Sequence, residues 1–182
     1  YEKLGGILYS AIKDIGFQNV TIISNLEISA TREKKILPKI LFGFELKSYS
    51  FLKYKTRSDT LKTLKIKCLT VLSDDISYLK NKIQINQDII SGVFLTKNLT
   101  SEPANFLTPS EFVNQIEDLK KIGIEIDILD ETRMSDLGMN ALLGVGKGSK
   151  NKSYLAVMKW NGNPKIESNI AFVGKGVCFD SG

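Results

Sequence analysis

The chain has 182 residues, of which 42% are apolar and 25% charged, and lysine supplies nearly all of its net charge of +5. This composition is ordinary for a globular protein, and no apolar run approaches the roughly 20 residues that span a bilayer. The sequence has no histidine, which excludes a histidine-based catalytic triad or a histidine zinc site within it, and its two cysteines lie too far apart for a zinc finger or a disulfide framework.

The first half of the sequence predicts helices that alternate with strands. Apolar residues recur at helical spacing or at the period of a strand, and glycine marks the first boundary. The expected elements are a helix over 4–15 that ends at Gly16, a strand over 19–23, a helical region over about 28–54 with Pro38 near its start, and a strand over 64–72.

A long third helix is expected next, with Asp74 as its N-cap and an end near Lys97. Because this helix follows a self-contained series of helices and strands, a domain boundary is expected near Asn98. The expected domains are a partial N-terminal α/β domain over 1–77, a linking helix over 78–97, and the N-terminal part of a second domain over 98–182.

The second half opens with strong helix signals. Thr108 is a natural N-cap, Pro109 suits the first helical position, and Glu111 completes a capping box. The further expected features are a buried stripe of Phe112, Ile116, Leu119 and Ile122, a helix end at Gly123, a strand over 124–129, a short helix over 131–137 that ends at Gly138, and strands over 154–160 and 169–173. Alternating helices and strands in both halves predict an α/β architecture.

Two glycine-rich stretches contain lysines that are candidates for a binding site. The first, GVGKGSKNKS, spans 144–153 and includes Lys147. A phosphate-binding P-loop needs serine or threonine directly after its lysine and a helix after the loop. Gly148 follows Lys147 instead, and the next expected element is a strand, so a flexible connection is favoured. A phosphate-binding α/β protein that uses Lys147 or Lys175 stays an alternative.

The second stretch, FVGKGVCFDSG, ends the chain and fails the same test, because Gly176 follows Lys175. Residues five apart in a regular strand point to opposite faces. Lys175 and Asp180 can therefore converge only if the backbone bends between them. Gly174 and Gly176 permit such a bend.

This final stretch resembles the signature of the leucyl aminopeptidase (cytosol aminopeptidase) family of two-metal exopeptidases. That signature reads Val-Gly-Lys-Gly, a hydrophobic residue, a small residue, and then Phe-Asp-Ser/Thr-Gly-Gly. The chain matches it through Gly182, with Cys178 at the small-residue position. Upstream, NLTSEPANFLTPSEF and LGMNALLGVGKGS resemble two further segments of the family in the same order. The first 97 residues fit the family's divergent N-terminal domain and linking helix loosely.

The resemblance implies an N-terminal α/β domain joined by a long helix to the start of an α/β catalytic domain with a central mixed sheet. It also implies that Lys175 and Asp180 are metal ligands for two divalent ions, Mn²⁺ or Zn²⁺. A ligating lysine must be deprotonated, so its pKa must lie well below the ordinary value of about 10.4, which burial and nearby dications can achieve. Two metals about 3.5–4 Å apart can activate a water and polarise the scissile carbonyl.

The family's remaining metal ligands and its catalytic lysine and arginine follow this motif, so no catalytic residue is expected up to Gly182. We therefore expect a fragment, cut at both ends and inactive by itself, of a metalloaminopeptidase that releases N-terminal residues from peptides with a leucine-type preference. The resemblance implies a cytoplasmic homohexamer with no membrane attachment. A non-catalytic DNA-binding or regulatory member of the family is a further alternative, which the basic charge favours.

Overall fold

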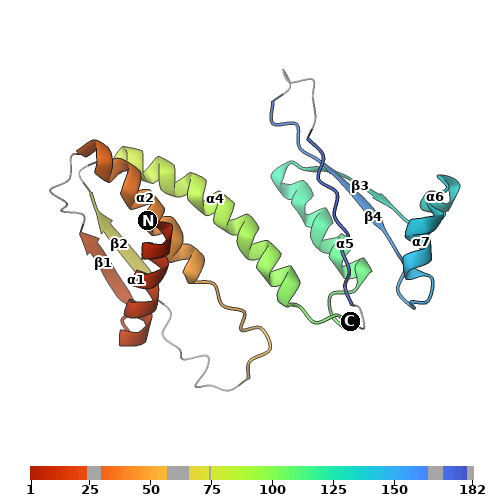
Figure 1. Ribbon diagram of the computed structural model, residues 1–182, viewed down its shortest axis with the longest axis horizontal. Helices are drawn as coiled ribbons and strands as arrows, with labels where there is room; N and C mark the ends of the chain where they lie inside the picture. Colours follow the sequence, from red (N-terminus) through yellow and green to blue (C-terminus); the bar gives the residue numbers. More distant parts are fainter. Residues whose placement is uncertain (24–29, 57–65, 74, 164–169, 180–182) are drawn as a thin grey trace. The chain divides into compact units, whose positions relative to one another are not determined.

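The computed structural model describes residues 1–23, 30–56, 66–73, 75–163 and 170–179 (Figure 1). The chain divides into two compact units, Tyr1–Ser101 and Glu102–Gly182. Each unit combines helices with a pair of strands, which confirms the α/β class expected from the sequence. Within the described residues, no helix is both long and apolar enough to cross a membrane.

In the first unit, two parallel strands pack against two helices. Its elements are α1 (Glu2–Ile15), β1 (Asn19–Ile23), α2 (Ala30–Lys47), β2 (Cys68–Leu72) and α4 (Ile76–Ser101). The strands pair in parallel from Asn19 with Cys68 to Ile23 with Leu72. The core consists of Leu37, Leu41 and Leu79 from α2 and α4, with Ile22, Leu69, Val71 and Ile83 packed against it. Alternate strand residues therefore face these helices, as expected for a sheet with one covered face.

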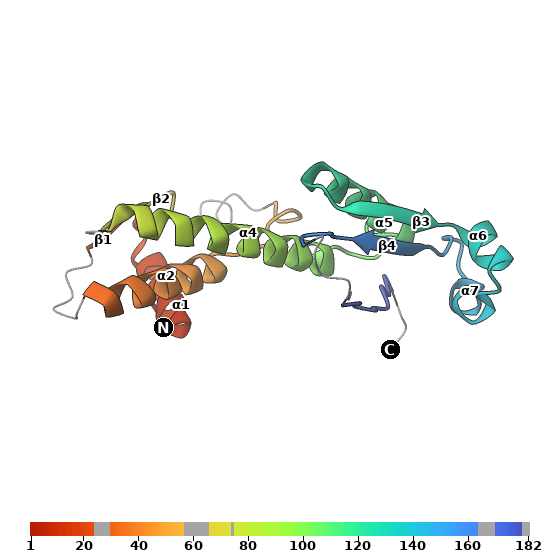
Figure 2. The same ribbon diagram turned by 90° about the horizontal axis from the view of Figure 1, so that it is seen from above.

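Two glycines bring α1 and α2 into close contact, and α2 lies between α1 and α4 (Figure 2). A Cβ atom at Gly5 would collide with the backbone carbonyl of Ile40, and one at Gly43 would collide with that of Glu2. Beside this crossing, the rings of Tyr9 and Phe44 meet edge to face with their centroids 5.2 Å apart. The two helix backbones can approach this closely only because neither crossing residue has a side chain.

The expected position of Pro38 near a helix start is wrong, because α2 runs through this residue. A proline in a helix interior removes one backbone hydrogen bond and costs about 3 kcal/mol. The helix continues because Leu37, Leu41 and Phe44 are 4–6% exposed and bury the apolar face of α2 on both sides of the proline. The expected helix end at residue 54 is also wrong, since α2 ends at Lys47.

The third expected helix is confirmed as α4, which extends beyond Lys97 to Ser101. The expected cap, Asp74, lies outside the described residues. The side chain of Asp75 accepts a hydrogen bond from the backbone N–H of Tyr78 at 3.1 Å. An aspartate therefore satisfies one of the free N–H groups in the first turn of α4.

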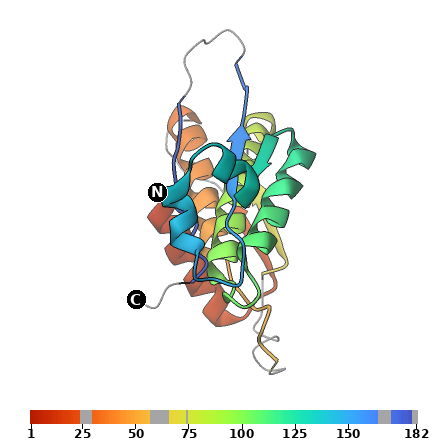
Figure 3. The same cartoon turned by 90° about the vertical axis from the view of Figure 1, so that its right-hand side faces the viewer.

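The second unit contains an antiparallel strand pair (Figure 3). Its elements are α5 (Pro109–Glu117), the 3₁₀ helix η1 (Asp118–Ile122), β3 (Glu125–Leu129), α6 (Glu131–Asp136), α7 (Asn140–Gly146) and β4 (Leu155–Lys159). Strand pairing runs from Glu125 with Lys159 to Leu129 with Leu155. Helices α6 and α7 lie at the end of the pair where β3 ends and β4 begins (Figure 2).

Three expectations for the second unit need correction. Ile122 is 67% exposed rather than buried, because the α-helical spacing behind that prediction stops at Glu117 and η1 continues the chain. Helix α7, which ends within the glycine-rich stretch at 144–153, is not among the expected elements. The expected strand over 169–173 is wrong for its described part, 170–173, which has no strand structure and leaves Val173 99% exposed. A strand forms by pairing, and 170–173 has no such partner within the described residues.

Candidate metal-binding segment

The segment 174–179 holds the lysine that the sequence singled out. Lys175 is exposed, and its carbonyl accepts a hydrogen bond from the N–H of Val177 at 3.1 Å, which closes a tight turn over three residues. Among the described residues, none forms an ion pair or hydrogen bond with the Lys175 side chain. Asp180, the second expected ligand, lies outside the described residues. The structure therefore locates one of the two predicted ligands, and their convergence stays a prediction.

Helix α5 lies against this segment. A Cβ atom at Gly176 would be 2.9 Å from Cε1 of Phe112 on α5. The start of α5 is defined by Thr108, whose side-chain oxygen accepts a hydrogen bond from the N–H of Glu111 at 3.3 Å, and by Pro109 at the first helical position. The expected start of this helix is thereby confirmed, and it fixes the helix that contacts the lysine turn.

Cys178 follows in the same segment as a half-buried free thiol. Burial raises the pKa of the Cys178 thiol above its ordinary value, because the thiolate loses hydration. A raised pKa lowers the thiolate fraction at neutral pH, and the thiolate is the reactive form. Cys178 therefore has the character of a packing residue rather than a nucleophile.

The glycine-rich stretch at 144–153 has a structure that does not favour phosphate binding. It includes the end of α7 and a turn in which Ser149 donates its N–H to the carbonyl of Gly146 at 2.9 Å. The N–H of Ser153 is donated to the carboxylate of Glu131 at 2.9 Å. A phosphate loop needs free N–H groups at the start of a helix. Here a carboxylate already accepts the N–H of Ser153, and the stretch leads into the strand β4 instead of a helix.

Asp127 on β3 and Arg133 on α6 form an ion pair that the sequence analysis did not predict. Arg133 donates two hydrogen bonds to the Asp127 carboxylate, at 2.8 and 3.1 Å, and a third to the carbonyl of Ile128 at 3.0 Å. The hydrogen bond from Arg133 holds the pKa of Asp127 below its ordinary value, and the same bond raises the pKa of Arg133. Only the capping signal of Asp130 between them, which predicts a tight strand-to-helix turn, could have indicated this contact.

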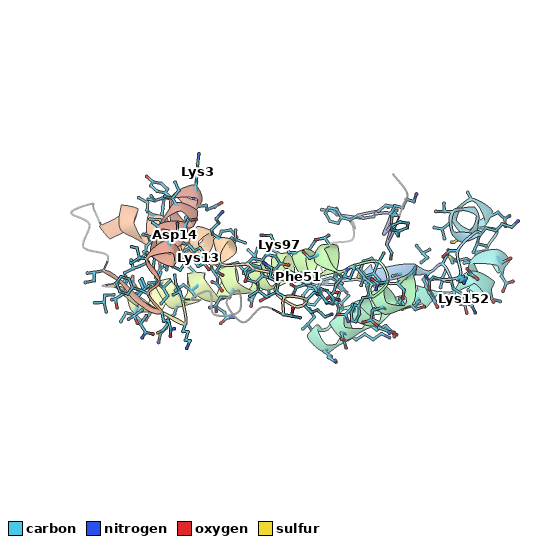
Figure 4. The ribbon with its side chains drawn as sticks, turned by 90° about the horizontal axis from the view of Figure 1, so that it is seen from below. Lys3, Lys13, Asp14, Phe51, Lys97 and Lys152 are labelled. Carbon is cyan, nitrogen blue, oxygen red and sulfur yellow. The ribbon has the colours of Figure 1, made fainter. Side chains whose placement is uncertain are left out.

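A second cluster lies at the C-terminal end of α4, where Figure 4 labels Lys97. The Tyr49 hydroxyl donates a hydrogen bond to the side-chain oxygen of Asn98 at 3.1 Å. The Tyr49 ring lies 5.2 Å from the Phe94 ring and 5.0 Å from the Lys97 ammonium, measured to the ring centroids. These contacts attach the chain after α2 to the last turns of α4.

Within the described ranges, no group of three or more histidine, cysteine, aspartate or glutamate residues could hold a metal ion. Lys175 fits a ligand role in one respect, since its amine, which no acid among the described residues engages, is available to coordinate once it is deprotonated. One amine and one carboxylate are too few donors to bind two dications tightly.

Residues 94–182 match the cytosol aminopeptidase family, catalytic domain. A protein of Nitrobacter winogradskyi named "Probable cytosol aminopeptidase" is 39% identical over 186 residues, which cover 100% of this chain and 36% of that protein. A protein of the same name from Phytoplasma mali is 38% identical, covering 99% of this chain and 36% of its own length. The chain thus spans about a third of the length of these curated relatives.

A solved structure with a similar fold is a tomato leucine aminopeptidase mutant. It superposes with a TM-score of 0.75 at 24% sequence identity, covering 86% of this chain and 32% of the tomato protein. At this identity the likeness concerns the fold, and it supports the α/β arrangement described above.

Proposed function

We propose that the protein containing this chain is an aminopeptidase with a two-metal site, because residues 94–182 match the cytosol aminopeptidase family, catalytic domain. Lys175 carries the proposal, because it lies in the Gly-Lys-Gly turn of the matched segment and no described residue engages its side chain. In this role it would coordinate one metal ion, and Asp180 would contribute a carboxylate oxygen. The bound metals, Mn²⁺ or Zn²⁺, would supply an activated water and a polarised carbonyl.

In this proposal, the contribution of this chain is to supply those first two ligands. Lys175 lies in a tight turn and is exposed. The metal charge lowers the pKa of a ligating amine, so coordination releases a proton. The remaining ligands and the catalytic groups belong, in this proposal, to the part of the relatives that this chain does not span. Leucine-type preference, cytoplasmic localisation and a homohexameric assembly are part of the same proposal.

Leucine p-nitroanilide hydrolysis tests the proposal in the full-length protein and in the 182-residue chain. We expect metal-dependent hydrolysis by the full-length protein and none by the 182-residue chain. Lys175→Ala should lower kcat by more than about 100-fold. Loss of a residue that only orients a metal ligand typically costs up to about 100-fold, and loss of the ligand itself should cost more. Lys150→Ala removes an exposed lysine elsewhere in the second unit and is the matched control. Turnover by the 182-residue chain, or full activity of Lys175→Ala, would contradict the proposal.

A second candidate function is binding to a polyanion such as DNA, and the distribution of charge favours it. Residues 1–101 contain 16 lysine and arginine residues against nine acidic ones, a net charge of +7. Residues 102–182 contain nine against 11, a net charge of −2. The net positive charge of the chain therefore comes entirely from the first unit, and binding of a polyanion requires such a concentration of positive charge.

A further inference from the structure

We infer that Phe112 is a positioning residue for Lys175, because its ring occupies the space beside Gly176 and so fixes the course of the Gly-Lys-Gly turn. The inference rests on the proposed function, in which Lys175 is a metal ligand. Phe112 lies on α5, more than 60 residues before the turn in sequence, and acts on the lysine only through the intervening glycine.

The contact explains why residue 176 is a glycine. A Cβ atom there would lie 2.9 Å from Cε1 of Phe112 and 3.5 Å from Cδ1. Real Cβ atoms essentially never approach another atom closer than 3.0 Å. The backbone gives no second reason, since Gly176 is not among the glycines with a positive φ angle, which are Gly16, Gly123 and Gly138. The space for a side chain at residue 176 is therefore limited by the Phe112 ring and not by the backbone angle.

The other glycine beside the lysine behaves differently. Among the described residues, apart from Gly174 and its two chain neighbours, no heavy atom lies within 4 Å of the position that a Cβ would take at Gly174. The φ angle of Gly174 is not positive either. Both glycines flank Lys175, but among the described residues a side chain from another element limits the space for a Cβ atom at Gly176 and not at Gly174.

The helix that carries Phe112 is held in place. Its N–H donates to the carbonyl of Thr108 at 2.8 Å, within the first turn of α5. The Glu111 carboxylate next to it accepts hydrogen bonds from Gln115 at 2.8 Å and from Asn114 at 3.3 Å. A half-buried ring on a capped helix is a firm surface, so the turn at 175–177 follows the ring.

The contact can be measured in the 182-residue chain without any activity assay. An aromatic ring against Gly176 shifts the resonances of its amide and α protons, which glycine-selective labelling makes visible by NMR. We expect a ring-current shift at Gly176 that is lost in Phe112→Leu, while the resonances of Gly174 stay in place. An unchanged Gly176 signal in Phe112→Leu would overturn the inference.

The positioning role is tested by a compensating pair of substitutions in the full-length protein. We expect Gly176→Ala to lower kcat by about 100-fold, the order of effect that a displacement of about 1 Å can have, with KM little changed. Phe112→Ala removes the ring from the space beside residue 176. The kcat of the double variant should therefore be at least about tenfold higher than that of Gly176→Ala, and the double variant should bind more metal per chain than Gly176→Ala does. A double variant no better than Gly176→Ala would overturn the inference.

These outcomes separate the inference from the function on which it rests. If the wild-type protein hydrolyses no aminoacyl substrate with any metal, the proposed function fails, whereas the NMR experiment still decides whether Phe112 fixes the turn. If the wild-type protein is active and the double variant fails to recover, the positioning role fails and the aminopeptidase stands.

Discussion

Asp127 and Arg133 meet across the turn between β3 and α6 through two parallel hydrogen bonds. Both side chains are more than half exposed, so the pair contributes little to stability in water. Its geometric effect is larger, because the third hydrogen bond, from Arg133 to the carbonyl of Ile128, joins the side chain of α6 to the backbone of β3. The pair thus orients α6, whose Met134 is fully buried.

The lowered pKa of Asp127 predicts a specific pH dependence. A carboxyl whose pKa is lower in the folded state contributes stability above its unfolded pKa of about 3.9, and this contribution is lost as the pH falls through the folded value. We expect Arg133→Gln to raise the titration midpoint of the Asp127 carboxyl carbon, measured by NMR, towards 3.9. Lys159→Gln, which removes a cation from the 3.8 Å contact with Glu125, is the control. An unchanged midpoint in Arg133→Gln would show that the hydrogen bonds do not persist in solution.

At the scale of single residues, the sequence predicted what depends on local geometry. Thr108, Gly16 and Gly123 were recognised because capping and left-handed helix ends act within a few residues. The contacts of Phe112 with Gly176 and of Asp127 with Arg133 were not predictable, because each depends on how separate elements pack. Lys175 was found through its motif, and its environment became known only from the structure.

At the scale of elements, the contact between α1 and α2 depends on glycine at both crossing positions. The missing side chains allow each backbone to touch a carbonyl of the other helix, at Ile40 and at Glu2. Gly6 lies next to Gly5 in α1, yet a Cβ atom at Gly6 would lie 3.8 Å from the carbonyl oxygen of Gly43, which is an ordinary contact distance. Adjacent glycines in one helix thus have different roles, because only one of them faces α2 at close range.

This difference predicts opposite effects of two alanine substitutions. Gly43→Ala should lower the free energy of unfolding by about 1–3 kcal/mol or more, because the added methyl group collides with backbone rather than with a mobile side chain. Gly6→Ala should leave it unchanged or raise it by up to about 1 kcal/mol, since alanine favours the helix and space exists for it. Urea unfolding followed by far-UV circular dichroism measures both. Equal effects of the two substitutions would contradict the close crossing.

The elements that the sequence predicted poorly share a physical cause. Pro38 indicated a helix start because a proline lacks the N–H that interior positions donate. Burial of Leu37 and Leu41 keeps α2 intact through it, which is a property of the packed unit. The apolar run at 170–173 indicated a strand, yet a strand exists only with a partner to pair with. Local sequence patterns were overruled wherever tertiary contacts decided the outcome.

At the scale of the whole molecule, the two units differ in charge as well as in fold. The first unit carries a net charge of +7 and the second −2. The matched family segment, 94–182, covers the weakly acidic second unit and the last residues of α4. The basic balance therefore lies almost wholly outside the part that carries the proposed metal ligands, so the two candidate functions concern different parts of the chain.

This separation predicts how polyanion binding should respond to substitution. Lys35 and Lys39 are exposed and lie one helical turn apart on α2. Lys150 and Lys152 are exposed in the second unit, and Figure 4 labels Lys152. Replacing either pair with glutamate changes the net charge equally. We expect a gel shift with duplex DNA at low salt, weakened by Lys35→Glu with Lys39→Glu and little changed by Lys150→Glu with Lys152→Glu.

The salt dependence decides whether that binding is electrostatic contact with phosphates. Each phosphate neutralised by a lysine releases a counterion, so the logarithm of the affinity should fall linearly with the logarithm of salt concentration, with a slope of about −0.9 per contact. The α2 double variant should then show a shallower slope than the wild type, because it makes fewer contacts. Equal loss of affinity in both double variants would show that binding depends on net charge alone and not on the lysines of α2. No gel shift at low salt would exclude the second candidate function and leave the aminopeptidase proposal as the remaining one.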